Sequence, residues 1–183
     1  MARTSRNDWC VAGLAILRDQ GHEALTVDRL CAALQKTKGS FYHHFADLET
    51  YLGELLSFWE QELTEAPIER ASREASPQQR SARLDQVVRG LDHALDVSVR
   101  AWARRDERAG SAMQRVDRRR IDYLAELRRT AGHRNARMLA QLEYSAFVGA
   151  QQLGYFNEAR RAAKLGHAQH EALLLLAKAW AKR

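Results

Sequence analysis

The chain has 183 residues, of which 28% are charged and only two are proline, so it can form one compact domain or two small ones. This composition is typical of an all-helical soluble protein. No apolar run reaches the roughly 18 residues that a membrane-spanning helix needs, which excludes a membrane protein of that kind. The basic first residues are not followed by an apolar segment, so we expect no secretory signal and a cytoplasmic location.

The net charge of +6 favours a nucleic-acid partner, but its distribution does not locate a binding site. Residues 1–47 hold six Lys and Arg against five Asp and Glu, a net charge of +1, so the remainder carries +5. A case for DNA binding therefore rests on the order of residues. Arg3 and Arg6 fit either an arm that reaches a DNA groove or phosphate, or a solvated terminus.

Residues 26–47, TVDRLCAALQKTKGSFYHHFAD, predict two short helices joined by a tight turn, followed by the start of a third. Thr26 can cap the first helix, because its side-chain oxygen can accept amide protons of the first turn. Thr37 can cap the second, where Phe41 and Phe45 form an apolar i, i+4 pair. Asp47 is expected to cap the third.

The face opposite Phe41 and Phe45 carries side chains that suit phosphate oxygens and base edges. It offers short donors, a cation, a phenol and two imidazoles. These residues are Lys38, Ser40, Tyr42, His43 and His44. The second helix is therefore the predicted recognition helix.

Because of these residues, the segment 8–52 resembles the N-terminal domain of the TetR family of transcriptional regulators. In that family a first helix ending in Gly precedes a Thr-capped helix and a Ser/Thr-Lys-Gly-Thr-aromatic-Tyr-x-His-Phe run. The matching positions are Gly21, Thr26, Thr37, Lys38, Gly39, Ser40, Phe41, Tyr42, His44 and Phe45. Gln35 and Lys36 depart from the family's Gly and apolar residue, which predicts a reshaped turn. Residues 46–49 lack the family's phosphate-binding lysines, which predicts weaker contacts with the DNA backbone.

The resemblance implies a double-stranded DNA operator as partner. Carried over position by position, it implies base contacts from Lys38 and Ser40. The full set of implied DNA-binding residues is Thr26, Thr37, Lys38, Gly39, Ser40, Tyr42, His43 and His44. Of these, Thr26, Tyr42, His43 and His44 are expected mainly to hold phosphates.

Beyond Asp47 apolar residues recur at helical spacing, so the expected fold class is all-α. We expect an N-terminal helix-turn-helix DNA-binding domain, 1–47, and a C-terminal helical domain for effector binding and dimerisation, 48–183. A connecting helix is expected from residue 48 to about residue 65, where Pro67 stops it.

Four further helices are predicted from the same spacing. One long core helix is expected from Gln79 through Val99, and another from a cap at Asp106 to Gly132. Two apolar helices, roughly 136–156 and 167–180, complete the chain.

Members of the TetR family bind small effectors among the helices that correspond to 48–156. Aromatic side chains with a few polar neighbours in this region suit a hydrophobic or planar ligand, although such residues also fit an ordinary core. The candidate pocket residues are Trp59, His93, Trp102, Tyr123, Phe147 and Gln151.

The last two helices carry more apolar surface than one partner face can cover. In proteins resembling this one, these helices pair with their copies as a four-helix bundle, so we expect a homodimer. The candidate interface residues are Leu139, Leu142, Ala146, Gly149, Leu153, Leu173, Leu176 and Trp180. A two-fold dimer would address an inverted repeat with half-sites about 34–36 Å, or a multiple of that distance, apart.

No cofactor or metal is expected. His167, His170 and Glu171 have a spacing that could hold a metal, but neither a Cys nor a second cluster completes a site. Cys10 and Cys31 are read as core residues, with a redox switch as the alternative.

Three classes of function remain open at this stage. The favoured one is a ligand-responsive repressor. The second is a helical interaction module that has kept the fold without specific DNA binding. An enzyme is not expected, because no nucleophile, metal set or phosphate loop is present in the sequence.

Overall fold

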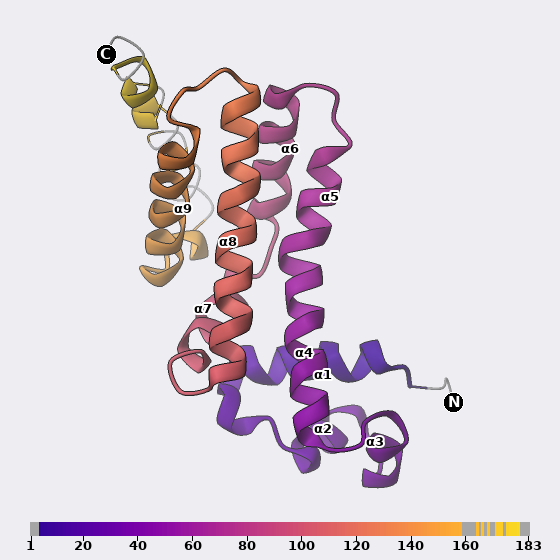
Figure 1. Cartoon of the computed structure of the whole chain (residues 1–183). Helices are drawn as coiled ribbons and strands as arrows, with labels where there is room; N and C mark the ends of the chain where they lie inside the picture. Colours follow the sequence, from indigo (N-terminus) through magenta and orange to yellow (C-terminus); the bar gives the residue numbers. More distant parts are fainter. Residues whose placement is uncertain are drawn as a thin grey trace. The chain divides into compact units, whose positions relative to one another are not determined.

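The computed structural model describes residues 4–158, 164, 166, 168, 171–173 and 175–179. Throughout these residues the secondary structure is helical, without a β-strand, which confirms the all-α prediction (Figure 1). Within the same residues, no helix combines the length and the apolar character needed to cross a membrane.

Contacts divide the chain into two compact units. The first comprises residues up to Leu63 together with Ala94–Gln114, and the second comprises Thr64–His93 together with the residues from Arg115 onward. These units are defined by contacts, whereas the expected boundary at residue 47 separates two functions. That functional boundary stays a prediction.

The first unit begins with five short elements. They are α1 (Arg6–Gln20), the 3-10 turn η1 (His22–Ala24), α2 (Val27–Leu34), α3 (Lys38–His44) and α4 (Leu48–Glu60). Thr26, Thr37 and Asp47 cap α2, α3 and α4, each accepting the amide proton of the residue three positions on. The three predicted caps are thus confirmed.

Aromatic side chains form the core beneath α3. Phe41 packs edge-on against Trp9 of α1, at 5.4 Å between ring centroids, and against Tyr51 of α4, at 5.5 Å. Phe45 contacts the same tyrosine at 5.0 Å, and all four rings are at most 1% exposed. The Tyr51 hydroxyl donates a hydrogen bond to the carbonyl oxygen of Trp9 (3.0 Å). These contacts fix α3 against α1 and α4.

The first unit also contains most of α7 (His93–Trp102) and the first two turns of α8 (Glu107–Thr130). Asp96 of α7 is buried, and its carboxylate accepts a hydrogen bond from the indole nitrogen of Trp59 in α4 (3.0 Å).

Three further contacts join the α7–α8 region to the N-terminal helices. The Trp102 ring stacks on His22, at 5.9 Å between centroids. Arg105 pairs with Glu23 (3.1 Å), and Arg108 pairs with Glu49 at the start of α4.

Pro67 does not stop the connecting helix, contrary to prediction. Helical structure continues from α4 through a π-helical segment, Gln61–Glu65, into α5 (Ala66–Ser72). Pro67 lies in the first turn of α5, where a missing amide proton costs little. The π-helical segment changes the hydrogen-bond register just before the proline, which lets the helical path continue.

The prediction of a single long helix from Gln79 through Val99 is also wrong. Two helices cover this region, α6 (Pro77–Arg89) and α7, with Gly90 at the end of α6. Glycine has a low helix propensity, and its amide bonds to the Val87 carbonyl in a tightened last turn (3.0 Å).

The second unit has a small core where α5, α6 and α8 lie side by side (Figure 1). Ile68 and Ala71 of α5 pack with Tyr123 and Leu127 of α8, and Leu84 of α6 covers this cluster. The hydroxyl of Ser72 donates to that of Tyr123 (3.1 Å).

The predicted limits of α8 are confirmed. The Asp106 carboxylate accepts the amide proton of Ala109 (2.8 Å), and Gly132 adopts a positive φ of 88° just beyond Thr130. α9 (Ala136–Gln152) and a 3-10 turn, η3 (Tyr155–Asn157), follow. The residues described between 164 and 179 are helical, whereas His167, His170 and Trp180 lie outside the described residues.

Candidate nucleic-acid interface

The turn between α2 and α3 is closed by Gln35 in a left-handed conformation, with φ 53° and ψ 45°. Among the described residues it is the only one other than glycine with a positive φ. The amides of Gln35 and Lys36 bond to the carbonyls of Ala32 (3.2 Å) and Cys31 (2.9 Å), which ends α2 in a regular way. The backbone therefore takes the conformation that glycine favours, rather than the reshaped turn expected from the sequence.

Replacing Gln35 by Gly is expected to stabilise the protein. A left-handed residue other than Gly costs about 1–2 kcal/mol, partly offset by the greater unfolded-state entropy of Gly, so we expect a gain of up to about 1 kcal/mol. Urea denaturation measures the gain. The matched control is Gln86→Gly in the interior of α6, which should lose about 1 kcal/mol. A loss of stability in both variants would contradict the assignment of strain to Gln35.

The structure gathers the predicted DNA-binding residues at the start of α2 and along α3. Lys38, Tyr42 and His43 are exposed, while Ser40 and His44 are half-buried. The hydroxyls of Thr26 and Thr37 accept the amide protons of Arg29 and Ser40 (3.3 Å each), so both threonines already serve as caps. Gly39 lies in the first turn of α3. Whether these residues touch DNA stays a prediction.

One residue at this surface escaped the sequence analysis. The carboxylate of Asp28, in the first turn of α2, lies 2.7 Å from the ammonium nitrogen of Lys38. Hydrogen bonding to Asp28 and its negative charge raise the pKa of Lys38. The sequence already placed an acidic residue two positions after the Thr26 cap, in the first turn of the predicted helix. That Asp28 pairs with Lys38 becomes apparent only in the folded structure.

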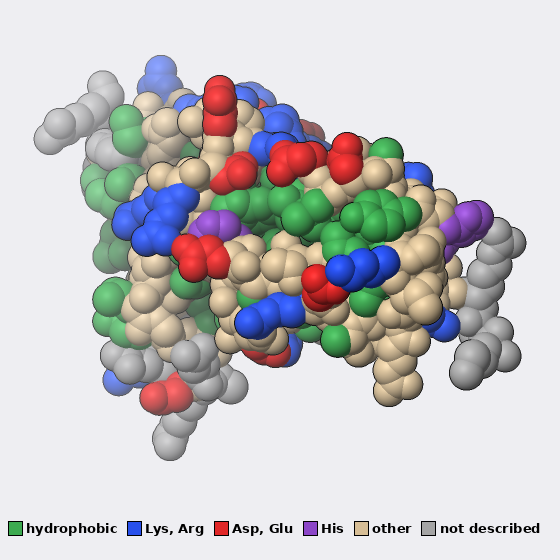
Figure 2. All heavy atoms as spheres, turned by 90° about the horizontal axis from the view of Figure 1, so that it is seen from below, with side chains coloured by type: hydrophobic (Ala, Val, Ile, Leu, Met, Phe, Trp, Pro, Cys, Tyr) green, Lys and Arg blue, Asp and Glu red, His purple; other side chains and the backbone are tan. Residues whose placement is uncertain are grey.

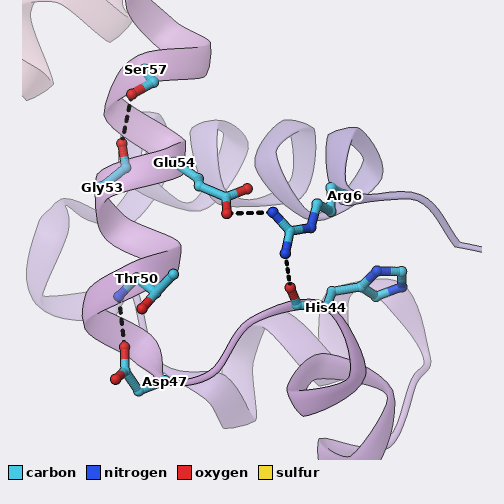
Figure 3. A network of polar contacts seen from close by, with 7 residues as sticks. All are labelled: Arg6, His44, Asp47, Thr50, Gly53, Glu54 and Ser57. Carbon is cyan, nitrogen blue, oxygen red and sulfur yellow. Dashed lines mark hydrogen bonds and ion pairs between the residues drawn. The ribbon is translucent and has the colours of Figure 1, made fainter.

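Arg6 does not extend as an arm toward DNA, which corrects one of the two readings of the N-terminus. Its guanidinium donates to the carbonyl oxygen of His44 (2.5 Å) and pairs with Glu54 (2.6 Å), as Figure 3 shows. It also lies 5.3 Å from the centroid of the Phe45 ring. Arg6 thus ties α1 to the end of α3 and to α4, while Arg3 lies outside the described residues.

Charges on the surface seen in Figure 2 are mixed. Acidic and basic side chains alternate around an apolar area, rather than forming one basic patch. This agrees with the net charge of +1 in residues 1–47. Electrostatic attraction of residues 1–47 to DNA would therefore come from few cations, and the loss of any one of them would weaken it noticeably.

The six candidate effector residues fall into separate groups. His93, Phe147 and Gln151 lie together. The amide nitrogen of Gln151 is 3.2 Å from Nδ1 of His93, and the ring centroids of His93 and Phe147 are 5.7 Å apart. Phe156 stacks on His93 at 4.0 Å. Tyr123 belongs instead to the α5–α8 cluster.

The two tryptophans of the candidate pocket have partners within the first unit. Trp59 donates to Asp96, and Trp102 stacks on His22. The structure thus brings together three of the six candidates, and their role in effector binding stays a prediction.

The candidate dimer residues differ in exposure. Leu142 of α9 is 41% exposed, Leu153 just beyond the end of α9 is 65% exposed, and Leu176 is 38% exposed. Ala146 is exposed, while Gly149 and Leu173 are half-buried. Leu139 instead packs inside its own chain, and the sequence analysis missed Met138, which is 51% exposed. Trp180 lies outside the described residues.

Both cysteines are buried free thiols. Burial raises the pKa of Cys10 to about 11 and also raises that of Cys31. At neutral pH both thiols therefore remain protonated, which argues against a redox switch. Among the described residues, no group of three or more His, Cys, Asp or Glu side chains is placed to hold a metal ion.

A capped α2, a tight turn and an exposed α3 on a buried aromatic core define a helix-turn-helix protein. Several solved structures share the fold of this chain. A transcriptional regulator described as a TetR/AcrR family member has a TM-score of 0.79 at 19% identity, covering 92% of this chain and 97% of its own. A TetR transcriptional regulator from Legionella pneumophila has a TM-score of 0.78 at 14% identity, covering 94% and 99%.

A TetR-family regulator from Mesorhizobium loti has a TM-score of 0.73 at 17% identity, covering 93% of this chain and 95% of its own. No protein-family model and no curated protein sequence matches this chain. The fold is nevertheless that of the TetR/AcrR family of transcriptional regulators, as the resemblance in residues 8–52 predicted.

Proposed function

We propose that this protein is a sequence-specific DNA-binding transcriptional regulator, and not an enzyme. It acts as a homodimeric repressor that binds an inverted-repeat operator and is released by a small-molecule effector. The observation that carries the proposal is the exposed face of α3, where Lys38, Tyr42 and His43 project from a helix whose other face is locked by Phe41 and Phe45. A rigid helix with donors on its free face fits the major groove.

Selection of bound fragments from the source genome by the purified protein tests the proposal. We expect enrichment of one inverted repeat, with affinity that falls steeply as salt rises. Lys38→Ala should lower affinity and relax base preference, because a lysine contact to guanine contributes about 1–3 kcal/mol of discrimination. Lys178→Ala, at an exposed helical position of the C-terminal segment, is the matched control. If Lys38→Ala keeps the base preference of the unmodified protein, Lys38 does not read a base.

A second candidate function is a helical interaction module without specific DNA binding. The mixed surface charges and the pairing of Lys38 with Asp28 favour it, because both reduce attraction to phosphate. The fragment selection separates the two functions. No enrichment even at low salt would favour the interaction module.

Dimerisation is supported by an apolar stripe along α9. Met138 and Leu142 are exposed four residues apart on this helix, Leu153 is exposed just beyond its last residue, and Gly149 within the helix permits close approach. An apolar stripe of this kind is suited to a second copy related by a two-fold axis.

Leu142→Glu is expected to convert the dimer into a monomer, because two buried carboxylates would face each other across the axis without partners. Sedimentation at several protein concentrations measures the change. Gln141→Glu, which adds the same charge at the neighbouring exposed position, should remain dimeric. A dimer that persists in Leu142→Glu would exclude this face as the interface.

Effector release would act on the His93, Phe147 and Gln151 cluster. Aromatic rings around one imidazole and one amide suit a planar, largely apolar ligand with a hydrogen-bonding group. Such a ligand must bind the DNA-competent and DNA-free states unequally, with a coupling on the order of 1–3 kcal/mol. A ligand that raises the Tm but leaves operator affinity unchanged would contradict release by this route.

A further inference from the structure

The contact between Asp28 and Lys38 joins the first turns of two helices. The 2.7 Å separation brings together side chains that are 74% and 61% exposed, respectively. The Thr26 and Thr37 caps fix the backbone of both turns. An acidic group therefore stands beside the cation that the proposed function assigns to base reading.

The position of this pair matters because α3 is poor in permanent positive charge. Lys38 is the only Lys or Arg in the sequence of α3, KGSFYHH. Asp28 does not cap α2, since Thr26 does so. Its carboxylate is thus available to Lys38, and in the absence of DNA the two charges offset each other.

From this arrangement we propose that Asp28 is a specificity-determining residue, which positions Lys38 and holds it back from DNA that lacks the right base. The inference rests on the proposed function of DNA reading. Nonspecific DNA offers Lys38 only phosphate attraction, and it also brings phosphate charge toward the Asp28 carboxylate. A guanine at the right place offers two acceptors, O6 and N7, which offset the loss of Asp28. Repulsion of the wrong partner is a common source of specificity.

The test compares affinity for the selected operator and for a scrambled duplex across a salt series. Asp28→Asn should tighten binding to the scrambled duplex several-fold, and binding to the operator by less, so that the ratio of the two affinities falls. Because one opposing charge is removed, the salt slope of nonspecific binding should steepen by about 1. Asp28→Glu, which keeps the charge, should restore discrimination.

Asp19→Asn is the matched control, since it removes the same charge from an exposed site at the end of α1 where Asp19 pairs with Arg18. The second control is Asp28→Asn combined with Lys38→Ala. If Asp28 acts through Lys38, its effect in that background should shrink to the level of Asp19→Asn.

Each outcome decides the question. Equal effects of Asp28→Asn and Asp19→Asn, or an Asp28→Asn effect that persists without Lys38, would overturn the inference. A loss of preference at one base pair that Asp28→Asn also causes in the Lys38→Ala background would likewise overturn it, by showing that Asp28 reads that base pair without Lys38. If the unmodified protein prefers no duplex, the proposed function itself fails, whereas discrimination that survives Asp28→Asn rejects only the role of Asp28.

Discussion

Gly13→Ala is expected to destabilise the N-terminal helices strongly and to abolish binding to DNA. A Cβ atom at Gly13 would lie 1.8 Å from the hydroxyl oxygen of Tyr51 and 3.1 Å from Cδ1 of Leu55. Tyr51 cannot swing away, because its ring is fully buried between Phe41 and Phe45 and its hydroxyl bonds to Trp9. Overpacking of this kind costs about 1–3 kcal/mol or more, which exceeds the gain of about 1 kcal/mol from replacing a helical Gly by Ala.

Urea denaturation and operator affinity measure this effect, and Gly53→Ala is its control. Gly53 lies inside α4, where an added Cβ would meet nothing within 4 Å, so that variant should gain up to about 1 kcal/mol. In Tyr51→Phe the closest contact is absent, and Gly13→Ala should cost less in that background. Full stability of Gly13→Ala alone would show that α1 and α4 are farther apart than described.

Asp96→Ala is the second substitution with a large expected effect. It removes the acceptor of the Trp59 indole proton, in a place where both side chains are at most 3% exposed. A buried donor without an acceptor costs about 1–3 kcal/mol, and the lost side-chain volume adds to that cost. The expected result is a lower urea midpoint with an unchanged slope.

Asp96→Asn distinguishes the hydrogen bond from the volume. Asparagine keeps an acceptor oxygen and nearly the same shape, so it should lose less stability than Ala. Trp59→Phe removes the donor, and Asp96→Ala should then cost less than it does beside Trp59. Equal losses for Ala and Asn, together with additivity between the two sites, would mean that the Trp59 hydrogen bond contributes nothing.

Features that depend on near neighbours in the chain could be predicted. The caps at Thr26, Thr37, Asp47 and Asp106 act within three residues, so the sequence was enough to place the starts of four helices. Local rules failed where the hydrogen-bond register could change. Pro67 follows a π-helical segment, which no local propensity indicates.

In the candidate site, too, features set by near neighbours in the chain could be predicted, and contacts between distant residues could not. The exposed face of α3 follows from the spacing of Phe41 and Phe45, and it was predicted. The contacts of Lys38 with Asp28 and of Arg6 with His44 and Glu54 span ten, 38 and 48 residues. Such contacts depend on how α1, α2, α3 and α4 pack, and side-chain types alone do not specify their partners.

The contacts of Trp102 with His22 and of Arg105 with Glu23 have a consequence for building hybrid regulators. A chimera cut at residue 47 would transplant His22 and Glu23 without the stacking ring and the arginine that meet them. Arg108 and Glu49 both lie beyond this cut, so that pair would stay together. A portable DNA-reading module from this protein should therefore carry residues 94–114 along with the first 63, or replace His22 and Glu23 with side chains suited to water.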